Sequence, residues 1–196
     1  MTPEDSGLCV RSDVLPDGSY GVTVTAGPDL AFTLDRSRAL PYAAACCREA
    51  TAAEYFTAVL RLLTERTATS REDGLAFVQE HLVAIPDLAA TAPLQFLGAA
   101  GRPKPPSPEA GRFTPIVLIR DQDGKDMGWF SPEQIRGHAT AVLDTLAVVD
   151  LDTRLLRTWV DDYGLPENNA RAAVGSLAAF LPGPLPTPTD ENRNTP

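Results

Sequence analysis

Apolar and polar residues alternate along the first part of the chain in the way that β-strands require. Val22 and Val24 lie two residues apart, as do Phe32 and Leu34, and residues at this spacing share one face of a strand. The sequences PDGS and AGPD, which favour tight turns, separate the apolar runs. The pattern predicts a three-stranded antiparallel meander with strands at about 8–14, 20–25 and 30–34.

Beyond the third strand, the apolar spacing becomes that of an amphipathic helix. Asp35 is a residue type that caps helices, and the apolar face continues to Arg66. Pro41 either kinks the first turns or marks the true start of this helix. A second helix is predicted from a Ser70 cap to Ile85, because the proline that follows ends it.

The middle of the chain, residues 98–111, is rich in proline and glycine and predicts a linker or long loop. The segment FTPIVLIRDQDGKDMGWF follows, and its two apolar arms around a polar turn predict a β-hairpin. Ser131 and Pro132 then form a helix start. The long helix after them either stays whole or divides near Asp150, and a last helix at about 166–181 precedes a polar tail.

Taken in order, these elements predict an α+β fold in which small antiparallel β-sheets are each followed by a long helix and a short helix. The expected organisation is a meander with a helical pair at 1–98, a Pro/Gly-rich linker at 99–111, a hairpin with a helical pair at 112–181 and a disordered tail at 182–196. The two halves form either one pseudo-symmetric body or two separate small domains joined by the linker.

The two halves also suggest an internal duplication of a ββαα unit. An offset of 95 residues aligns Val22 with Val117 in the hairpins, and an offset of 96 aligns Ala43 with Ala139 in the helices. The alternative is that two amphipathic helices with hairpins simply look alike.

Two cysteines, Cys46 and Cys47, stand side by side in an alanine-rich stretch of the first long helix. Neighbouring side chains in a helix point about 100° apart, so the two thiols cannot coordinate one metal ion or readily form a disulfide with each other. The offset of 96 aligns them with Val142 and Leu143, which we expect in the core. We therefore interpret both cysteines as small apolar residues packed in the core rather than as a redox pair or a metal site.

The chain has 196 residues, three cysteines and a formal net charge of −9. An acidic protein is a poor ligand for nucleic acid, which is bound through basic residues, and for anionic membranes. Neither a signal peptide nor a membrane span is predicted, so we expect a cytoplasmic protein with reduced thiols. Two lysines, Lys104 and Lys125, accompany many arginines and alanines, which is typical of a gene from a GC-rich bacterium or its phage.

The candidate ligand residues are three aspartates and the two histidines. The turn sequence DQDGKD brings Asp121, Asp123 and Asp126 close together, but their spacing lacks the later acidic residue of a calcium loop, so a soluble hairpin turn is the simpler interpretation. His81 and His138 are isolated on helices and belong to no catalytic or metal-binding motif. No cofactor is expected.

The candidate interface residues are Trp129, Phe130 and Trp159, because aromatic side chains often anchor protein contacts. The alternative is that Phe130 and Trp159 pack in the core while Trp129 is partly exposed.

The missing catalytic motifs favour a non-catalytic protein-binding or regulatory protein, such as an adaptor or an immunity-type partner, which binds another protein or a second copy of itself. Two alternatives stay open. One is a small-ligand-binding protein or an enzyme with a pocket between the two halves. The other is a structural component of a phage or mobile element.

Overall fold

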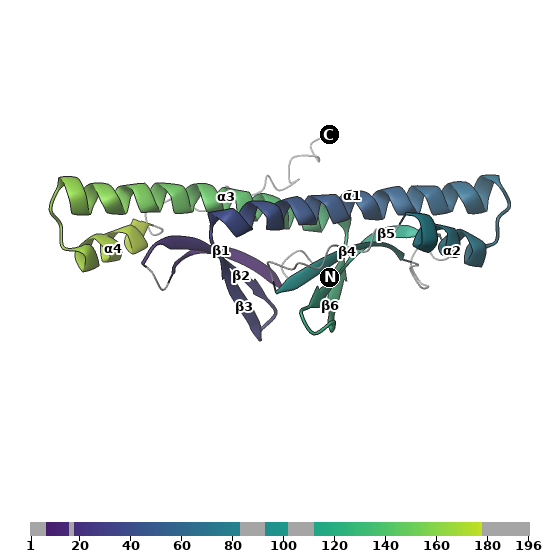
Figure 1. The fold of residues 1–196 in the computed structure, drawn as a ribbon, viewed down its shortest axis with the longest axis horizontal. Coiled ribbons are helices and arrows are strands. Elements are labelled where there is room, and N and C mark those ends of the chain that lie inside the picture. Colours follow the sequence, from purple (N-terminus) through teal and green to yellow (C-terminus); the bar gives the residue numbers. More distant parts are fainter. Residues whose placement is uncertain (1–6, 16–17, 83–92, 102–111, 178–196) are drawn as a thin grey trace, which may run out of the picture. The chain divides into compact units, whose positions relative to one another are not determined.

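The computed structural model describes residues 7–15, 18–82, 93–101 and 112–177 of the chain (Figure 1). The chain divides into two compact units, Met1–Asp150 and Leu151–Pro196. The division falls inside a helix, whereas the sequence placed a boundary at residues 99–111, which the structure describes only through residue 101.

The first β-sheet is the predicted meander. Strands β1 (Leu8–Val14), β2 (Tyr20–Ala26) and β3 (Leu30–Leu34) pair antiparallel in sequence order. Val22, Val24 and Leu34 are fully buried. These residues were assigned to strands from their alternation, and the strand boundaries agree with the prediction to within one residue.

Helix α1 (Arg36–Arg66) follows directly, and Asp35 caps it as predicted. The Asp35 carboxylate accepts a hydrogen bond from the backbone N–H of Arg38 at 3.0 Å and one from the Ser37 hydroxyl at 2.6 Å. Both hydrogen bonds stabilise the ionised carboxylate and so lower the pKa of Asp35, and the bond from Ser37 has the larger effect. Pro41 lies inside the helix rather than at its start, so the loss of one backbone donor in an early turn does not end the helix.

Helix α2 (Arg71–His81) begins at the predicted cap, where the Ser70 hydroxyl accepts a hydrogen bond from the backbone N–H of Asp73 at 3.1 Å. It ends earlier than predicted, with Leu82 as its C-cap. The predicted last residue, Ile85, lies outside the described residues.

The second sheet contains one strand that the sequence did not predict. Strands β4 (Leu94–Gly101), β5 (Thr114–Asp121) and β6 (Asp126–Phe130) pair antiparallel in sequence order. The β5–β6 hairpin is confirmed, but residues 98–101, expected to belong to a loop, form the end of β4. Glycine and alanine have low intrinsic preference for strands, and here the pairing with β5 supplies the backbone partners.

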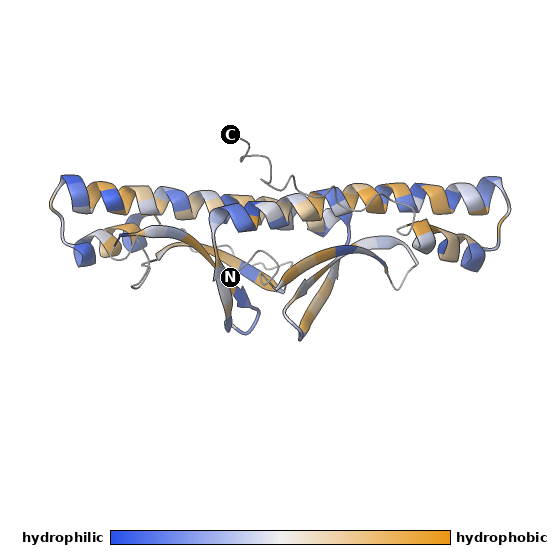
Figure 2. Cartoon of the chain, turned by 180° about the vertical axis from the view of Figure 1, so that it is seen from behind, coloured by the Kyte–Doolittle hydropathy of each residue, from blue (hydrophilic) through white to orange (hydrophobic). Residues whose placement is uncertain are grey.

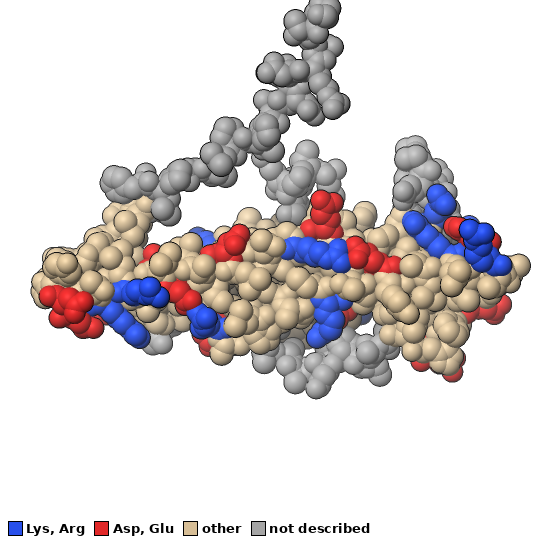
Figure 3. All heavy atoms as spheres, turned by 90° about the horizontal axis from the view of Figure 1, so that it is seen from above, with Lys and Arg blue, Asp and Glu red and all other residues tan. Residues whose placement is uncertain are grey.

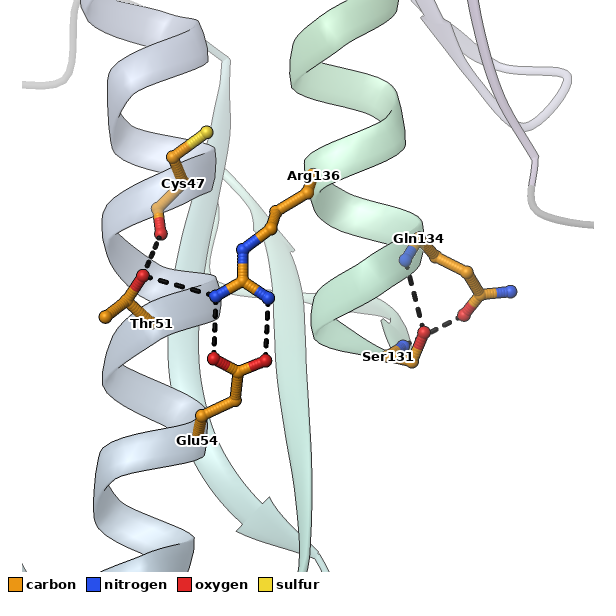
Figure 4. Close-up of polar contacts among 6 residues, drawn as sticks. All are labelled: Cys47, Thr51, Glu54, Ser131, Gln134 and Arg136. Atoms are coloured by element: carbon orange, nitrogen blue, oxygen red, sulfur yellow. Dashed lines mark hydrogen bonds and ion pairs between the residues drawn. The ribbon is translucent and has the colours of Figure 1, made fainter.

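Helix α3 (Pro132–Arg157) begins at the predicted cap and is not divided at Asp150. The Ser131 hydroxyl accepts a bond from the Gln134 N–H at 3.2 Å, and the Gln134 amide oxygen accepts one from the Ser131 N–H at 2.9 Å (Figure 4). Two N–H groups at the helix start are thereby satisfied reciprocally. The second unit continues with a π-helical turn, η2 (Thr158–Asp162), and α4 (Glu167–Ser176).

Within the first unit, α1 and α3 run antiparallel and side by side along one side of the two sheets (Figure 1). Arg136 of α3 donates two hydrogen bonds to the Glu54 carboxylate of α1, at 2.6 and 2.7 Å (Figure 4). Arg36, at the start of α1, forms an ion pair with Asp150. The two ion pairs join opposite ends of the overlapping stretch and hold the helices in one layer.

The fold is therefore α+β, with two three-stranded antiparallel sheets, each followed by helices, as the sequence predicts. Apolar, orange stretches run along the strands and both long helices (Figure 2). None of the described helices combines the length and the apolar character needed to cross a lipid bilayer.

The prediction that both neighbouring cysteines pack in the core is confirmed for Cys46 and wrong for Cys47. Cys46 is fully buried, as is Val142 at the aligned position, whereas Cys47 is exposed, as is Leu143. The 100° rotation between helix neighbours explains the difference, because the sheets cover only one side of α1 and α3. The same rotation keeps the two thiols apart.

Candidate functional site

A groove lies between α1, α2 and the first two strands of the second sheet. Its volume is about 690 Å³. Eleven apolar side chains line it: Ala52, Tyr55, Phe56, Leu60, Leu75, Val78, Leu82, Leu97, Ala99, Ala100 and Leu118. The groove thus lies between elements from the two halves of the sequence.

A well-packed cluster of buried side chains supports the inner side of the groove. Phe56 and Leu60 of α1 form a buried cluster with Val78 of α2 and with Phe113, just before β5. The Arg61 side chain donates a hydrogen bond to the backbone oxygen of Phe113 at 2.8 Å, which ties the loop before β5 to α1. The cluster fixes α2 against α1 at the spacing that leaves the groove open on one side.

Strand β4 reaches α1 through a glycine. A Cβ atom placed at Gly98 would lie 2.5 Å from the backbone oxygen of Glu49 and 2.8 Å from the backbone nitrogen of Ala53, so no larger residue fits without moving the helix or the strand. The Gly98 N–H donates a hydrogen bond to the Glu49 carboxylate at 3.1 Å. This bond satisfies an outward-pointing amide on the edge of the sheet, which protects that edge from pairing with another strand.

The charged groups at the groove are engaged in contacts that hold the fold. Glu49 accepts from Gly98 and also forms an ion pair with Arg48 at 2.9 Å. Arg120 forms an ion pair with Asp126 at 2.6 Å. Both arginines keep their charges at the rim, so the groove combines an apolar floor with a polar edge.

One buried polar pair lies elsewhere, between the two long helices. The Tyr42 hydroxyl and His138 Nε2 are 2.9 Å apart and form a hydrogen bond. Burial lowers the pKa of His138 to about 4, from an ordinary value of 6.5. Burial, with a smaller contribution from Cys46, raises the pKa of Tyr42. The pair is therefore uncharged at neutral pH, and it joins α1 to α3 in the interior.

A smaller hollow of about 340 Å³ borders His138 and is lined by Leu8, Val10, Phe130 and Gln134 among others. Its walls come from β1, the end of β6 and α3. Among the described residues, no group of three histidine, cysteine or acidic side chains is arranged to hold a metal ion. The hollow thus presents one neutral imidazole among mainly apolar neighbours.

The structure separates the predicted candidates for ligand binding. Asp121 accepts hydrogen bonds from the N–H groups of Asp123 and Lys125, at 3.0 and 2.8 Å, so its carboxylate shapes the hairpin turn. Asp126 pairs with Arg120. His81 lies at the end of α2, where its ring contacts that of Phe77 with the two planes tilted by 60°, and it does not meet His138.

The three predicted interface aromatics also lie in different surroundings. Trp129 is 66% exposed, whereas Phe130, next to it, is buried. Trp129 borders a hollow of about 530 Å³ that Met127 and Leu8 also line. Trp159 is half-buried in the π-helical turn of the second unit. An interface role for these residues stays a prediction.

No local sequence motif singles out Tyr42, Glu49 or Gly98, although these residues shape the interior and the groove. One available signal would have found Tyr42, because the offset of 96 that aligns the long helices pairs it with His138. No sequence signal marks Gly98, since its need for close approach arises from a helix far away in the chain.

Comparison of the chain with protein-family models, with curated proteins and with solved structures found no match.

Proposed function

We propose that this chain is a non-catalytic, cytosolic protein-binding protein of the regulatory, adaptor or immunity type, and that the groove between α1 and α2 holds an apolar segment of its partner. The observation that carries the proposal is the lining of the groove, in which eleven apolar side chains surround about 690 Å³. The described residues leave this apolar surface uncovered, and uncovered apolar surface is typical of a site for another molecule.

The polar groups at the groove favour binding over a chemical reaction. A general acid or base must be free to exchange a proton with a substrate. Here the Glu49 carboxylate is held by the Gly98 amide and by Arg48, so its hydrogen-bonding capacity serves the fold. The rim arginines, Arg48 and Arg120, are each paired with a carboxylate, so the edge of the groove is polar but carries no marked excess of positive charge.

A small-ligand-binding protein is the second candidate, and the size of the groove favours it. Sites for small molecules are mostly apolar and typically enclose about 300–1,000 Å³, and this groove falls within that range. Native mass spectrometry of the protein purified from its host tests this candidate. A bound small molecule that departs on mild activation supports it, and only the mass of the bare chain speaks against it.

Site-specific photo-crosslinking tests the proposed function. Gln79 and Glu80 are neighbours on the exposed side of α2, but only Gln79 lines the groove. A photoreactive phenylalanine analogue at position 79 is expected to form a discrete protein adduct in an extract of the native host, whereas the same analogue at position 80 is not. Equal adducts at both positions, or none at position 79, would refute the proposed role of the groove.

The predicted internal duplication is a further part of this proposal. Aligned positions share their burial: Val22 with Val117, and Ala43 with Ala139, are all at most 2% exposed. Tyr42 and His138, 96 residues apart, meet in the interior, as equivalent residues do next to a two-fold axis. These observations support a unit used twice, with the groove built where the first helical pair covers strands of the second half.

A further inference from the structure

The smaller hollow beside His138 lies apart from the groove and has the features of a second site. Its volume is about 340 Å³, and none of the described residues that line it also lines the groove. Both halves of the sequence contribute walls, from β1, the end of β6 and one face of α3. His138 is buried, whereas Gln134 and Gly137 are exposed, so these two residues lie at the mouth of the hollow and His138 lies at its inner end.

The hydrogen bond to Tyr42 fixes which nitrogen of His138 carries the proton. Because burial lowers the pKa of His138 to about 4, the ring is neutral at pH 7 and has one N–H group. The buried Tyr42 hydroxyl has one hydrogen-bond partner among the described residues, His138 Nε2 at 2.9 Å. A buried hydroxyl without an acceptor is costly, so the hydroxyl donates and Nε2 accepts. The proton of His138 is therefore on Nδ1.

The Nδ1–H group of His138 is a fixed donor that borders the hollow. The side chain makes no second hydrogen bond within the described part of the chain, and Nδ1 is not one of the buried atoms sealed away without a partner. The hollow thus reaches the ring. The rings of Tyr42 and Phe96, with centroids 5.7 and 6.4 Å from that of His138, hold the imidazole in place.

Gln134 adds a second donor, four residues earlier on α3. Its amide oxygen accepts the hydrogen bond from the Ser131 N–H (Figure 4), whereas its amide NH₂ group has no partner among the described residues. Residues four apart lie on one face of a helix, and both Gln134 and His138 line the hollow. The hollow therefore has N–H donors at its mouth and at its inner end.

The remaining lining and the charge of the chain indicate a neutral ligand. The other side chains that line the hollow are apolar in the described residues: Leu8, Val10, Phe130 and Ala141. No lysine or arginine is among these described lining residues, and burial of an anion without a cation is costly. The chain has a net charge of −9, and on the helix side of the molecule blue basic groups lie beside red acidic groups (Figure 3).

We propose that this hollow binds a small neutral molecule that carries a carbonyl oxygen on an apolar body. The oxygen accepts hydrogen bonds from His138 Nδ1 and from the Gln134 amide, and the body packs against the apolar walls. Sites for small molecules typically enclose about 300–1,000 Å³ and combine an apolar lining with a few placed polar groups. The hollow has these properties, and the proposal does not depend on what the groove binds.

An NMR titration of the full, ¹⁵N-labelled chain tests the proposal. Acetophenone carries a carbonyl oxygen, and ethylbenzene has the same ring and the same two-carbon chain without it. Acetophenone is expected to shift the Nδ1 signal of His138 saturably and to leave the ring signals of His81, on α2, unchanged. Its dissociation constant is expected to be about fivefold lower than that of ethylbenzene, as one neutral hydrogen bond typically contributes.

Two glycines give a matched pair of substitutions. A Cβ atom at Gly137 or at Gly175 would meet no neighbouring atom within 4 Å. Both residues are exposed on helices, but only Gly137 lines the hollow. Gly137→Leu is expected to fill the mouth and to raise the dissociation constant of acetophenone at least about tenfold, whereas Gly175→Leu is expected to leave it unchanged.

A substitution at Gln134 separates binding from a structural role. Gln134→Glu keeps an oxygen for the Ser131 N–H but removes the amide donor, so the preference for acetophenone over ethylbenzene is expected to fall at least about threefold. A purely structural role at the helix start would leave this preference unchanged, which would overturn the proposal. Equal affinity for the two probes, no saturable shift at His138 up to the solubility of acetophenone, or normal binding by Gly137→Leu would also overturn it.

Discussion

Acid is expected to destabilise the protein through His138, the buried partner of Tyr42. The folded chain binds a proton at His138 with a pKa of about 4, whereas an exposed histidine has an ordinary value of 6.5. Between these two pH values the unfolded chain binds more protons than the folded chain, so unfolding takes up a proton and stability falls as the pH falls. The stabilisation is fully present above the unfolded pKa and is lost on the way down to the folded pKa.

The size of the effect follows from the difference between the two pKa values. One pKa unit corresponds to about 1.4 kcal/mol, so the full difference between the values of 6.5 and about 4 corresponds to about 3 kcal/mol. At pH 5 about 2 kcal/mol of this is already lost, while most carboxylates are still ionised. A loss of this size is a large part of the stability of a domain, which is typically about 5–15 kcal/mol.

Urea denaturation at pH 7 and at pH 5 measures the effect. The free energy of unfolding of the wild type is expected to fall by about 2 kcal/mol between these conditions. The His138→Gln variant keeps a polar group for the Tyr42 hydroxyl but has no proton to bind, so it should lose little over the same range. The readout is the change with pH within each variant, and a uniform loss of stability from the substitution therefore cancels.

A direct titration shows whether the reasoning is sound. In a His81→Gln variant, His138 is the single histidine of the chain, and its ring signals in an NMR spectrum can be followed in the folded protein. We expect no protonation shift above pH 5. A histidine that titrates near its ordinary value in the folded state, or a His138→Gln variant with the wild-type pH dependence, would show that burial does not control this group.

Three further outcomes are expected. Gly98→Ala should destabilise the chain by more than about 2 kcal/mol in urea denaturation, because the added methyl group would lie 2.5 Å from the backbone of α1. The control Gly137→Ala, in open space on α3, should be neutral or stabilising. Equal effects of the two substitutions would contradict the close approach of β4 to α1. Thr57→Val should raise stability by about 1 kcal/mol, since the buried Thr57 hydroxyl has no hydrogen-bond partner among the described residues; a loss of similar size would mean that the hydroxyl is bonded. In dilute folded protein, a thiol reagent should modify Cys47 rapidly and Cys46 only on unfolding, because Cys46 is fully buried and burial raises its pKa. Mass spectrometry measures the labelling, and rapid modification of both cysteines would contradict the burial of Cys46.

Much of the secondary structure could be read from the sequence, because its signals are local. The caps at Asp35, Ser70 and Ser131 act on N–H groups two or three residues away. The alternation of apolar residues in β2 and β3 depends only on the two-residue repeat of a strand. These short-range signals predicted five of the six strands in the described residues and the starts of the three helices that have such caps.

The surfaces and the candidate sites required the tertiary structure. The sequence shows that Cys46 and Cys47 are small and apolar, but only the position of the sheets decides that the first is buried and the second faces outwards. Likewise, β4 contains the sequence GAAG, which carries no strand signal of its own, and it forms a strand because β5 pairs with it and α1 lies against Gly98.

What the sequence by itself determined is therefore the type and order of the described elements other than β4 and the π-helical turn, together with the α+β class, since each of these rests on interactions within a few residues. The tertiary structure decided the groove, the neutral Tyr42–His138 pair and the different exposure of Cys46 and Cys47. The physical reason is that burial, desolvation and close approach depend on which distant segment comes to lie against a residue, and a local pattern does not specify that segment.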